Sequence, residues 1–260
     1  MANWDPELYL RFEEQRTRPC RELVGRLTLP AGEVRQALDL GCGPGNSTAV
    51  LMARYPGTHI MGVDSSPEML AMARVDFPNW VFEQGDLRTW QPAPEIRGKL
   101  DVILANAALQ WVPDHAACFP RLMGWLRKGG EMAVQIPRSD ELPVLQLIVD
   151  VARNPAFAGV FAGFTPPYLV HKPEAYYDWL APHCRHIDLT EVIYYHIMDG
   201  PEGVVEWVKG TGLRPWLDHA GARREEFLAE YARRIAGAYP RRADGKVLMA
   251  FRRLNILARR

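Results

Sequence analysis

Short apolar runs and amphipathic stretches alternate along the first half of the chain. The runs have the length and composition of buried strands, and the stretches between them have helix-forming residues. The predicted strands are 36–40, 58–64, 80–86, 100–106 and 129–137, and the predicted helices are 46–55, 66–74 and 115–126. Strands that alternate with helices of this length predict an α/β fold with a parallel, doubly wound sheet.

The pattern changes after Pro137. Residues 138–185 are rich in proline and aromatic residues and contain helical pieces, and 201–240 has the pattern of two or three helices. Between and after them, 186–198 and 246–259 alternate as strands. We therefore expect one domain of the following parts: an N-terminal helical lid (1–30), a cofactor-binding core (31–137), helical substrate-cap insertions (138–185 and 199–246) and closing strands (186–198 and 247–260).

The strand at 186–198 carries "YYH" near its end. The apolar residues Ile187, Leu189 and Ile193 have the same parity as Tyr195. Side chains alternate between the two faces of a strand, so this parity predicts that Tyr195 faces the core. Tyr194 and His196 are then expected to face a pocket, with packing at a sheet edge as the alternative.

A glycine loop follows the first strand in "ALDLGCGPGNST" at 37–48. Its spacing is Gly41-x-Gly43-x-Gly45, which differs from the G-x-G-x-x-G of dinucleotide sites, and no Lys-Ser/Thr follows as in a phosphate-binding P-loop. Asp39 precedes the loop and would repel a pyrophosphate, whereas it suits a ligand with an amino group and a sulfonium. A nicotinamide or flavin nucleotide is the alternative at this point.

Polar side chains stand at the ends of the next predicted strands. Asp64 is placed to accept hydrogen bonds from ribose hydroxyls, and Asp86 to accept one from an adenine amino group, with the Leu87 amide beside it. Asn106 ends the fourth strand. Each residue alone is more typical of a turn or cap, but together they predict one ligand crevice at the carboxyl edge of the sheet.

Composition and charge exclude several kinds of site. The 31 Lys and Arg residues balance 31 Asp and Glu residues, which argues against a nucleic-acid partner bound through bulk charge. The four cysteines are widely spaced and the histidines do not pair at ligand spacing, so we expect reduced thiols and no metal. Because the sequence has no signal peptide and no long apolar run, we expect a cytoplasmic monomer that binds no membrane.

The motifs "LDLGCGPGNST", "GVDSSPEML", "GDLRTW" and "ANAALQWVPDH" resemble those of class I S-adenosylmethionine-dependent methyltransferases. The stretches "NWDPELYLRFEEQRTRP" and "WVKGTGLRPWL" resemble, more narrowly, members that esterify a carboxylate of a small polycarboxylate such as trans-aconitate. This resemblance implies a Rossmann-like, seven-stranded sheet whose last strand is antiparallel, and S-adenosylmethionine as cofactor. The predicted cofactor-binding residues are Arg18, Asp39, Gly41, Cys42, Gly43, Asn46, Asp64, Ser65, Asp86, Leu87 and Asn106.

Methyl transfer from a sulfonium to a carboxylate needs no general base, because a carboxylate is already ionised at neutral pH. We therefore predict no catalytic acid or base, only residues that position the acceptor. A guanidinium binds a carboxylate through two hydrogen bonds, which makes Arg214 the leading candidate. The predicted substrate-binding residues are Arg214, Trp216, Tyr194, His196, Tyr9 and Trp111. A hydroxyl or amine acceptor, or a cofactor-binding protein without turnover, are the alternatives.

Overall fold

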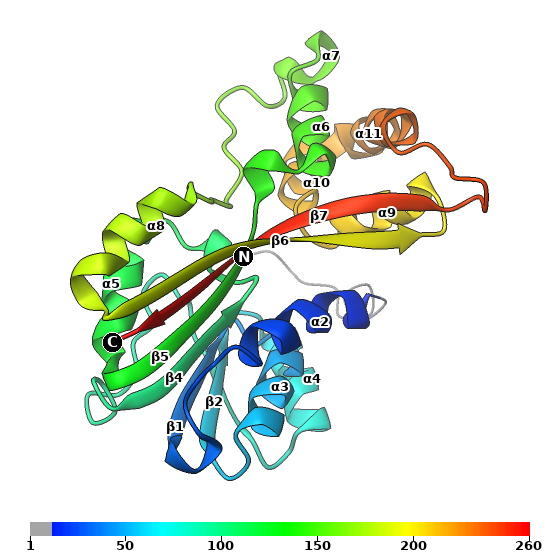
Figure 1. Ribbon diagram of the computed structural model, residues 1–260. Helices are drawn as coiled ribbons and strands as arrows, with labels where there is room; N and C mark the ends of the chain where they lie inside the picture. The colour runs from blue at the N-terminus through cyan, green and yellow to red at the C-terminus, as the bar shows by residue number, and fades with distance from the viewer. Residues whose placement is uncertain (1–11) are drawn as a thin grey trace. The chain divides into compact units, whose positions relative to one another are not determined.

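The computed structural model describes residues 12–260, and contacts between Cα atoms divide them into two compact units (Figure 1). The sheet unit comprises Glu13–Pro137, Leu169–Val192 and Leu254–Arg260. The helical unit comprises Phe12, Arg138–Tyr168 and Ile193–Arg253. Residues 169–185, predicted as part of an insertion, therefore group with the sheet, and the expectation of one capped domain stays a prediction.

In this described part of the chain, seven strands form one sheet in the order β3-β2-β1-β4-β5-β7-β6. The strands are β1 (Gln36–Leu40), β2 (His59–Asp64), β3 (Val81–Gln84), β4 (Leu100–Asn106), β5 (Leu126–Pro137), β6 (His186–Met198) and β7 (Val247–Arg259). The pairs β1–β2, β2–β3, β1–β4 and β4–β5 are parallel. The first five strands lie where the apolar runs predicted them.

Strand β7 runs antiparallel to β5. The Arg138 N–H donates to the Arg252 carbonyl at 3.0 Å, and the Arg260 N–H donates to the Gly130 carbonyl at 2.9 Å. The residue numbers of the paired positions rise along β5 and fall along β7, which defines an antiparallel pair. The predicted class I arrangement, with an antiparallel last strand, is confirmed.

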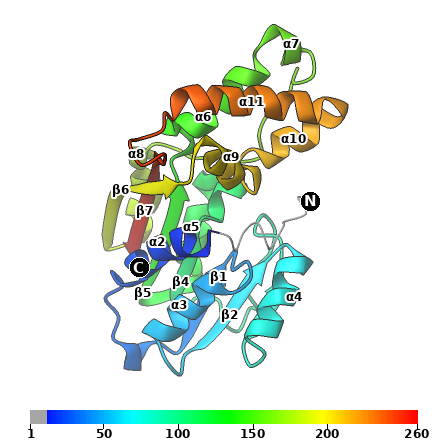
Figure 2. The same ribbon diagram turned by 90° about the vertical axis from the view of Figure 1, so that its right-hand side faces the viewer.

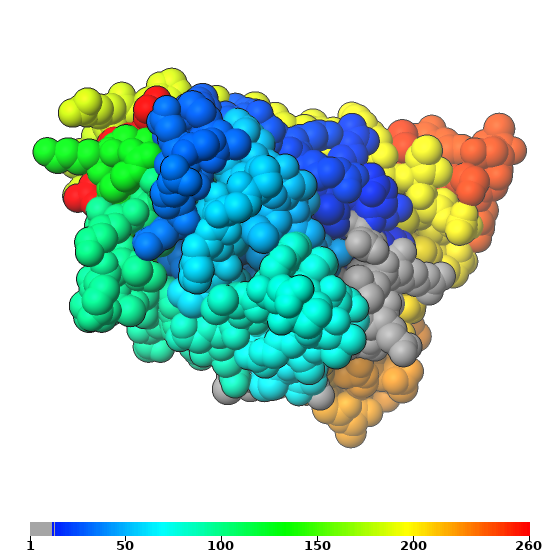
Figure 3. Space-filling model, turned by 90° about the horizontal axis from the view of Figure 1, so that it is seen from below, coloured from blue at the N-terminus to red at the C-terminus, as the bar shows by residue number. Residues whose placement is uncertain are grey.

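Helices cover both faces of the sheet unit (Figures 1 and 2). On one face α2 (Glu13–Val24) and α3 (Asn46–Arg54) pack through a core that includes Leu23 and Leu51. On the other, α5 (His115–Trp125) and α8 (Pro173–Leu180) pack through Phe119 and Tyr176. The side chains of α2 to α4 adjoin one another on the surface in Figure 3. The unit also has α4 (Pro67–Asp76) and the 3₁₀ helices η1 (Ala31–Glu33), η2 (Leu109–Trp111) and η4 (Ala181–His183).

The helical unit has its own aromatic core, which includes Trp207, Trp216, Phe227 and Tyr231. Tyr231 is fully buried and its hydroxyl donates to the Val144 carbonyl at 2.8 Å. The helices are η3 (Ser139–Glu141), α6 (Pro143–Ala152), α7 (Pro155–Ala158), α9 (Pro201–Lys209), α10 (Arg214–Ala220), η5 (Gly221–Arg223) and α11 (Arg224–Ala238). No described helix of either unit is long and apolar enough to cross a membrane.

Strands β6 and β7 pass from one unit to the other, and the parity of their buried residues changes at the boundary. In the sheet unit the even positions of β7 are in the core formed with α5 and α8, whereas Leu257 packs on the other face, and in the helical unit the odd positions are in the core. The buried residues are Leu254, Ile256 and Ala258 in the first, and Val247, Met249 and Phe251 in the second. No single parity therefore describes either strand.

Candidate active site

The glycine loop leaves β1 at its carboxyl end. Its Gly41 N–H donates to the Val63 carbonyl at 2.7 Å, and Gly41 has a φ of +74°. A Cβ at this position would lie 2.2 Å from the Ala108 Cβ, so only glycine fits. Cys42 is buried, and burial raises the pKa of its thiol. The loop therefore presents bare backbone beside the turn that follows β4.

Asp39 is buried beneath this loop. Its Oδ2 accepts hydrogen bonds from the Ser47 hydroxyl at 2.7 Å and the Thr48 hydroxyl at 2.6 Å, while its Oδ1 is buried without a hydrogen-bond partner. Burial raises the pKa of Asp39 to about 6, so most of it is still charged at pH 7. Asp39 anchors the first turn of α3 and keeps a negative charge under the loop. The side chain has no accessible surface in this structure. Its direct contact with a cofactor therefore stays a prediction.

Asp64 joins the end of β2 to the glycine loop. Its Oδ2 accepts from the Gly43 N–H and its Oδ1 from the Ser66 N–H, both at 2.9 Å. Burial raises the pKa of this carboxyl group. Each carboxylate oxygen has a further lone pair, which fits the predicted acceptance from ribose hydroxyls. Ser65, beside it, accepts from Gln84 Nε2 through its carbonyl at 3.3 Å.

The start of α3 has no side-chain cap. The capping residue is Gly45, with a φ of +97°. Asn46 is the first helical residue and is partly buried. The hydroxyl groups of Ser47 and Thr48, in the first turn of the helix, donate hydrogen bonds to the Asp39 carboxylate.

Asp86 follows β3 and forms an ion pair with Arg88. The Arg88 Nε lies 2.9 Å and 2.8 Å from the two carboxylate oxygens, and these bonds lower the pKa of Asp86. From α5, Arg121 donates to the Leu87 carbonyl at 3.0 Å and the Arg88 carbonyl at 3.4 Å. An adenine amino group would share Asp86 with Arg88. Neither arginine was among the predicted site residues, although Arg88 lies in the motif "GDLRTW".

Asn106 ends β4 with its Oδ1 buried and without a hydrogen-bond partner. The next residue, Ala107, has a φ of +54°, and its N–H donates to the Gln135 carbonyl at 2.9 Å. A left-handed conformation costs a residue with a Cβ about 1–2 kcal/mol. Strained backbone of this kind is concentrated at functional sites, in agreement with the predicted role of Asn106.

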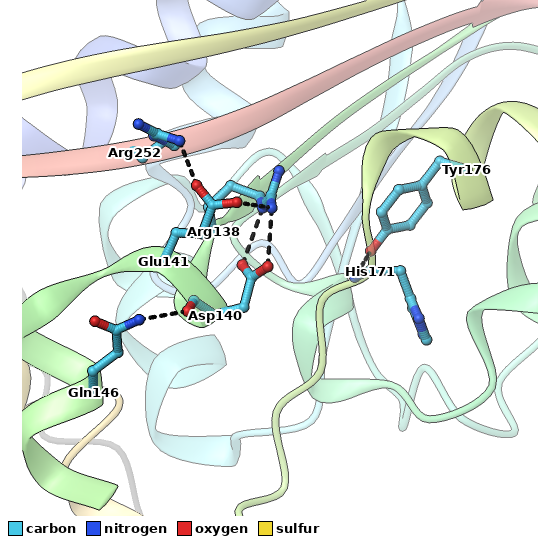
Figure 4. Close-up of polar contacts among 7 residues, drawn as sticks. All are labelled: Arg138, Asp140, Glu141, Gln146, His171, Tyr176 and Arg252. Atoms are coloured by element: carbon cyan, nitrogen blue, oxygen red, sulfur yellow. Dashed lines mark hydrogen bonds and ion pairs between the residues drawn. The ribbon is translucent and has the colours of Figure 1, made fainter. Parts of the chain in front are cut away.

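Trp111 lies in η2, partly buried, just beyond this turn. The carbonyl of Leu109 in the same 3₁₀ helix lies 2.9 Å from His115 Nε2, and His115 Nδ1 lies 2.9 Å from the Tyr176 hydroxyl. The same hydroxyl accepts from the His171 N–H (Figure 4). Burial lowers the pKa of His115, so the ring is neutral at pH 7 and fixes η2 in place.

The helical unit contains most of the predicted acceptor-binding residues. Arg214 begins α10 with 18% of its side chain exposed, and its Nε lies 3.8 Å from Asp218 Oδ2. Trp216 is buried in the aromatic core, where its Nε1–H donates to the Tyr168 hydroxyl at 3.1 Å. Arg214 is thus the more accessible of the two. Its predicted role requires this, because a residue that binds a free acid has to be accessible.

The predicted orientation of Tyr195 is wrong. Its side chain is 61% exposed, whereas Tyr194 and His196 are buried. The His196 ring packs against Trp207, with centroids 4.7 Å apart. The prediction failed because Ile187 and Leu189 belong to the sheet unit, whose core takes the opposite parity.

A buried cation in the helical unit was not predicted. Arg138 is almost fully buried and bonds to Asp140 at 2.9 and 3.0 Å and to Glu141 at 2.6 Å (Figure 4). Glu141 also pairs with Arg252, and Gln146 Nε2 donates to the Asp140 carbonyl at 2.9 Å. The network links the end of β5 to the start of α6.

Two predicted residues come from the N-terminal region. Tyr9 lies outside the described residues. Arg18 is exposed on α2, with its Nε 2.8 Å from Glu22 Oε1. Phe12, the first described residue, packs edge-on against Trp207 at 5.1 Å between centroids.

The sheet unit supplies a donor set that fits S-adenosylmethionine. The glycine loop admits close approach of a ligand, Asp64 and Asp86 are hydrogen-bond acceptors, and Asn106 Oδ1 is an acceptor without a donor. Hydroxyl and amino groups would supply the donors. Among residues 12–260, no three His, Cys, Asp or Glu side chains gather as they would around a metal ion.

Comparison with known proteins agrees with this site. Residues 37–130 match the family model described as a methyltransferase domain. A trans-aconitate 2-methyltransferase of Methylobacterium radiotolerans is 46% identical over 100% of this chain and 99% of its own. One from Variovorax paradoxus is 44% identical, again over 100% of this chain and 99% of its own.

Solved structures share the fold at low sequence identity. The YcgJ protein of Bacillus subtilis superposes with a TM-score of 0.60 at 14% identity, covering 94% of this chain and 98% of its own. A phosphoethanolamine N-methyltransferase of Haemonchus contortus, solved with S-adenosyl-L-methionine, gives 0.55 at 14% identity, covering 94% and 52%.

Proposed function

Because the chain belongs to the trans-aconitate 2-methyltransferase family, we propose that it forms a monomethyl ester on a carboxylate of trans-aconitate or a similar small polycarboxylate. The observation that carries this proposal is the extent of the chain over which it is similar to its relatives. Identity of 44–46% covers the whole chain, including Arg138–Tyr168 and Ile193–Arg253, and is not confined to the cofactor motifs at 37–130.

When bound, S-adenosylmethionine supplies an electrophilic methyl group on a sulfonium. The acceptor carboxylate is ionised at neutral pH, so this chain has no proton to remove from it. Asp64 and the glycine loop position one reactant, and Arg214 is proposed to bind the other. Holding two reactants in line contributes roughly 7–11 kcal/mol to catalysis.

The aromatic ring of Trp111 is proposed to lie against the reacting groups. An aromatic face attracts a sulfonium with about 0.5–2 kcal/mol and excludes water. The neutral His115 holds η2, and thereby Trp111, in place through the Leu109 carbonyl. No residue acts as acid or base in this scheme.

The test is turnover of labelled S-adenosylmethionine with a panel of di- and tricarboxylates. We expect transfer to trans-aconitate, with a product whose methyl group is released by mild base, as an ester's is. A base-stable product would indicate a hydroxyl or amine acceptor. Adenosylhomocysteine binding without transfer to any acceptor would indicate a protein without turnover. Asp64→Ala is the control that should abolish transfer at low cofactor concentration.

A further inference from the structure

A row of three carboxamides crosses the sheet unit. Asn106 of β4 is the register partner of Gln135 of β5. The bonds Arg138–Arg252 and Arg260–Gly130 fix the β5–β7 register at both ends, which places Gln135 opposite Asn255 of β7. Residues paired in this way point to the same face, so the three amides stand side by side.

The surroundings of this row are apolar. The preceding row on the same face consists of Leu104, Ala133 and Leu257, which pack in the core with α2 and α3. Gln135 is fully buried and Asn255 is 3% exposed. The Oδ1 atoms of Asn106 and Asn255 are buried without hydrogen-bond partners.

Buried amide oxygens without donors destabilise a fold, and native proteins usually pair them. Leucine or valine at these positions would continue the apolar face of the sheet. Three adjacent carboxamides at the carboxyl ends of β4 and β5 therefore indicate a ligand, because this edge is where open α/β sheets bind ligands.

The order of the strands indicates which ligand. The residues predicted to hold the cofactor follow the sheet from Asp86 after β3 to Asp64 on β2, the loop after β1 and Asn106 on β4. The next strands outward are β5 and β7, which carry Gln135 and Asn255. The row thus extends past the predicted cofactor residues, onto strands that carry none of them, and could contact a second ligand.

We propose that Gln135 and Asn255, next to the predicted cofactor residue Asn106, bind the carboxylate that accepts the methyl group; this assignment rests on the proposed function. A terminal amide turned by 180° presents its NH₂ group, and the O and N atoms are distinguished only by their hydrogen bonds. A neutral NH₂ donor orients a carboxylate oxygen without cancelling its charge, as an ion pair with arginine would, so the oxygen stays nucleophilic. Because Gln135 and Asn255 are buried, the acceptor has to displace the side chains that cover them.

Asn255→Asp tests this assignment because it keeps the shape of the side chain and adds a negative charge. We expect the acceptor KM to rise at least about tenfold through repulsion, with the adenosylhomocysteine Kd from calorimetry within twofold of wild type. The matched control is Gln36→Glu at the opposite, amino end of β1, whose Oε1 is also buried without a partner. It should lower Tm without changing the acceptor KM.

An unchanged acceptor KM in Asn255→Asp would overturn the assignment, as would tighter cofactor binding, which would mean that the row binds the cofactor's ammonium group. If Asn255→Asp does not fold, the neutral Asn255→Thr decides: a KM raised about fivefold supports the assignment and an unchanged one overturns it. Failure of the proposed function is separate, since wild-type protein would then esterify no acid.

Discussion

The core that the sheet unit forms with α5 and α8 and the core of the helical unit take opposite parities of the same two strands. In the sheet unit β7 places Leu254, Ile256 and Ala258 in this core, with Asn255 and Leu257 on its other face, and in the helical unit it buries Val247, Met249 and Phe251. Strand β6 changes in the same way: Ile187 and Leu189 pack in the first, and Tyr194 and Met198 are buried in the second. When a long strand packs in two cores, a single alternation of buried and exposed side chains does not predict which of its residues face the core.

The two units also differ in the sign of their buried charged side chains. In the sheet unit, the buried Asp39 holds hydroxyl groups of α3 and the partly buried Asp64 holds a backbone N–H of the glycine loop. In the helical unit, the most buried charges are arginines, among them Arg138 and Arg253. Buried carboxylates suit a cationic cofactor. Arg138 is already paired with Asp140 and Glu141, so the proposed contact of the helical unit with an acidic acceptor is Arg214. We therefore propose that residues of the sheet unit provide cofactor affinity, and that Arg214 and the carboxamide row provide acceptor affinity.

The largest expected effect concerns the change in parity. Tyr194→Ala should lower the free energy of unfolding by about 3 kcal/mol, because it removes a buried ring. Tyr195→Ala should change it by no more than about 0.5 kcal/mol, since that ring is exposed. Urea denaturation measures both. Equal losses would show that both faces of this part of β6 are covered.

The next effect concerns cofactor affinity in the sheet unit. Asp64→Ala removes the acceptor of two backbone N–H groups and the proposed ribose contact, so the adenosylhomocysteine Kd should rise about 100-fold. The acceptor KM at saturating cofactor should stay within twofold. Asp76→Ala, an exposed carboxylate at the end of α4, is the control. A change in acceptor KM as large as that in Kd would contradict the assignment of affinities.

A smaller and opposite effect is expected in the helical unit. Arg214→Ala should raise the acceptor KM about tenfold by removing a bidentate partner, with cofactor Kd nearly unchanged. Arg224→Ala is a matched control, because Arg224 pairs with the same Asp218. Equal losses for cofactor and acceptor would show that Arg214 has been misassigned.

The smallest expected effect depends on pH. The pKa of Asp39 is about 6 in the free protein, and a cationic cofactor favours the charged form, so its pKa falls on binding. Affinity should therefore be full above pH 7 and fall about fivefold by pH 5 as Asp39 is protonated. Calorimetry across this range measures it. Asp39→Asn should bind more weakly at pH 7 and show a flat profile; a flat wild-type profile would remove Asp39 from cofactor binding.

Much of the sheet unit could be predicted because its signals are local. The apolar runs and the glycine loop lie within a few residues of the groups they position, and β6 begins and ends at His186 and Met198 as expected. The carboxamide row could not be predicted, since Gln135 and Asn255 become neighbours only through strand register. The one local signal for Asn255 is an amide inside the otherwise apolar "LNILA".

In the helical unit the elements could be predicted but their faces could not. The proline at the start of α9 and the pattern of α11 are visible in the sequence. The orientation of Tyr195 instead depends on where the core of one unit ends and that of the other begins. Arg138 was missed because an arginine after a strand is usually solvated, and only its bonds to Asp140 and Glu141 distinguish it.

The close approach of Gly41 to Ala108 has a consequence for how related sequences can diverge. A methyl group at position 41 would collide with the Ala108 side chain, so the two sites are epistatic: alanine at 41 is tolerated only alongside glycine at 108. Even that double replacement leaves a left-handed backbone at 41. Laboratory evolution toward new acceptors would gain most by holding this pair constant and varying the positions beyond β4.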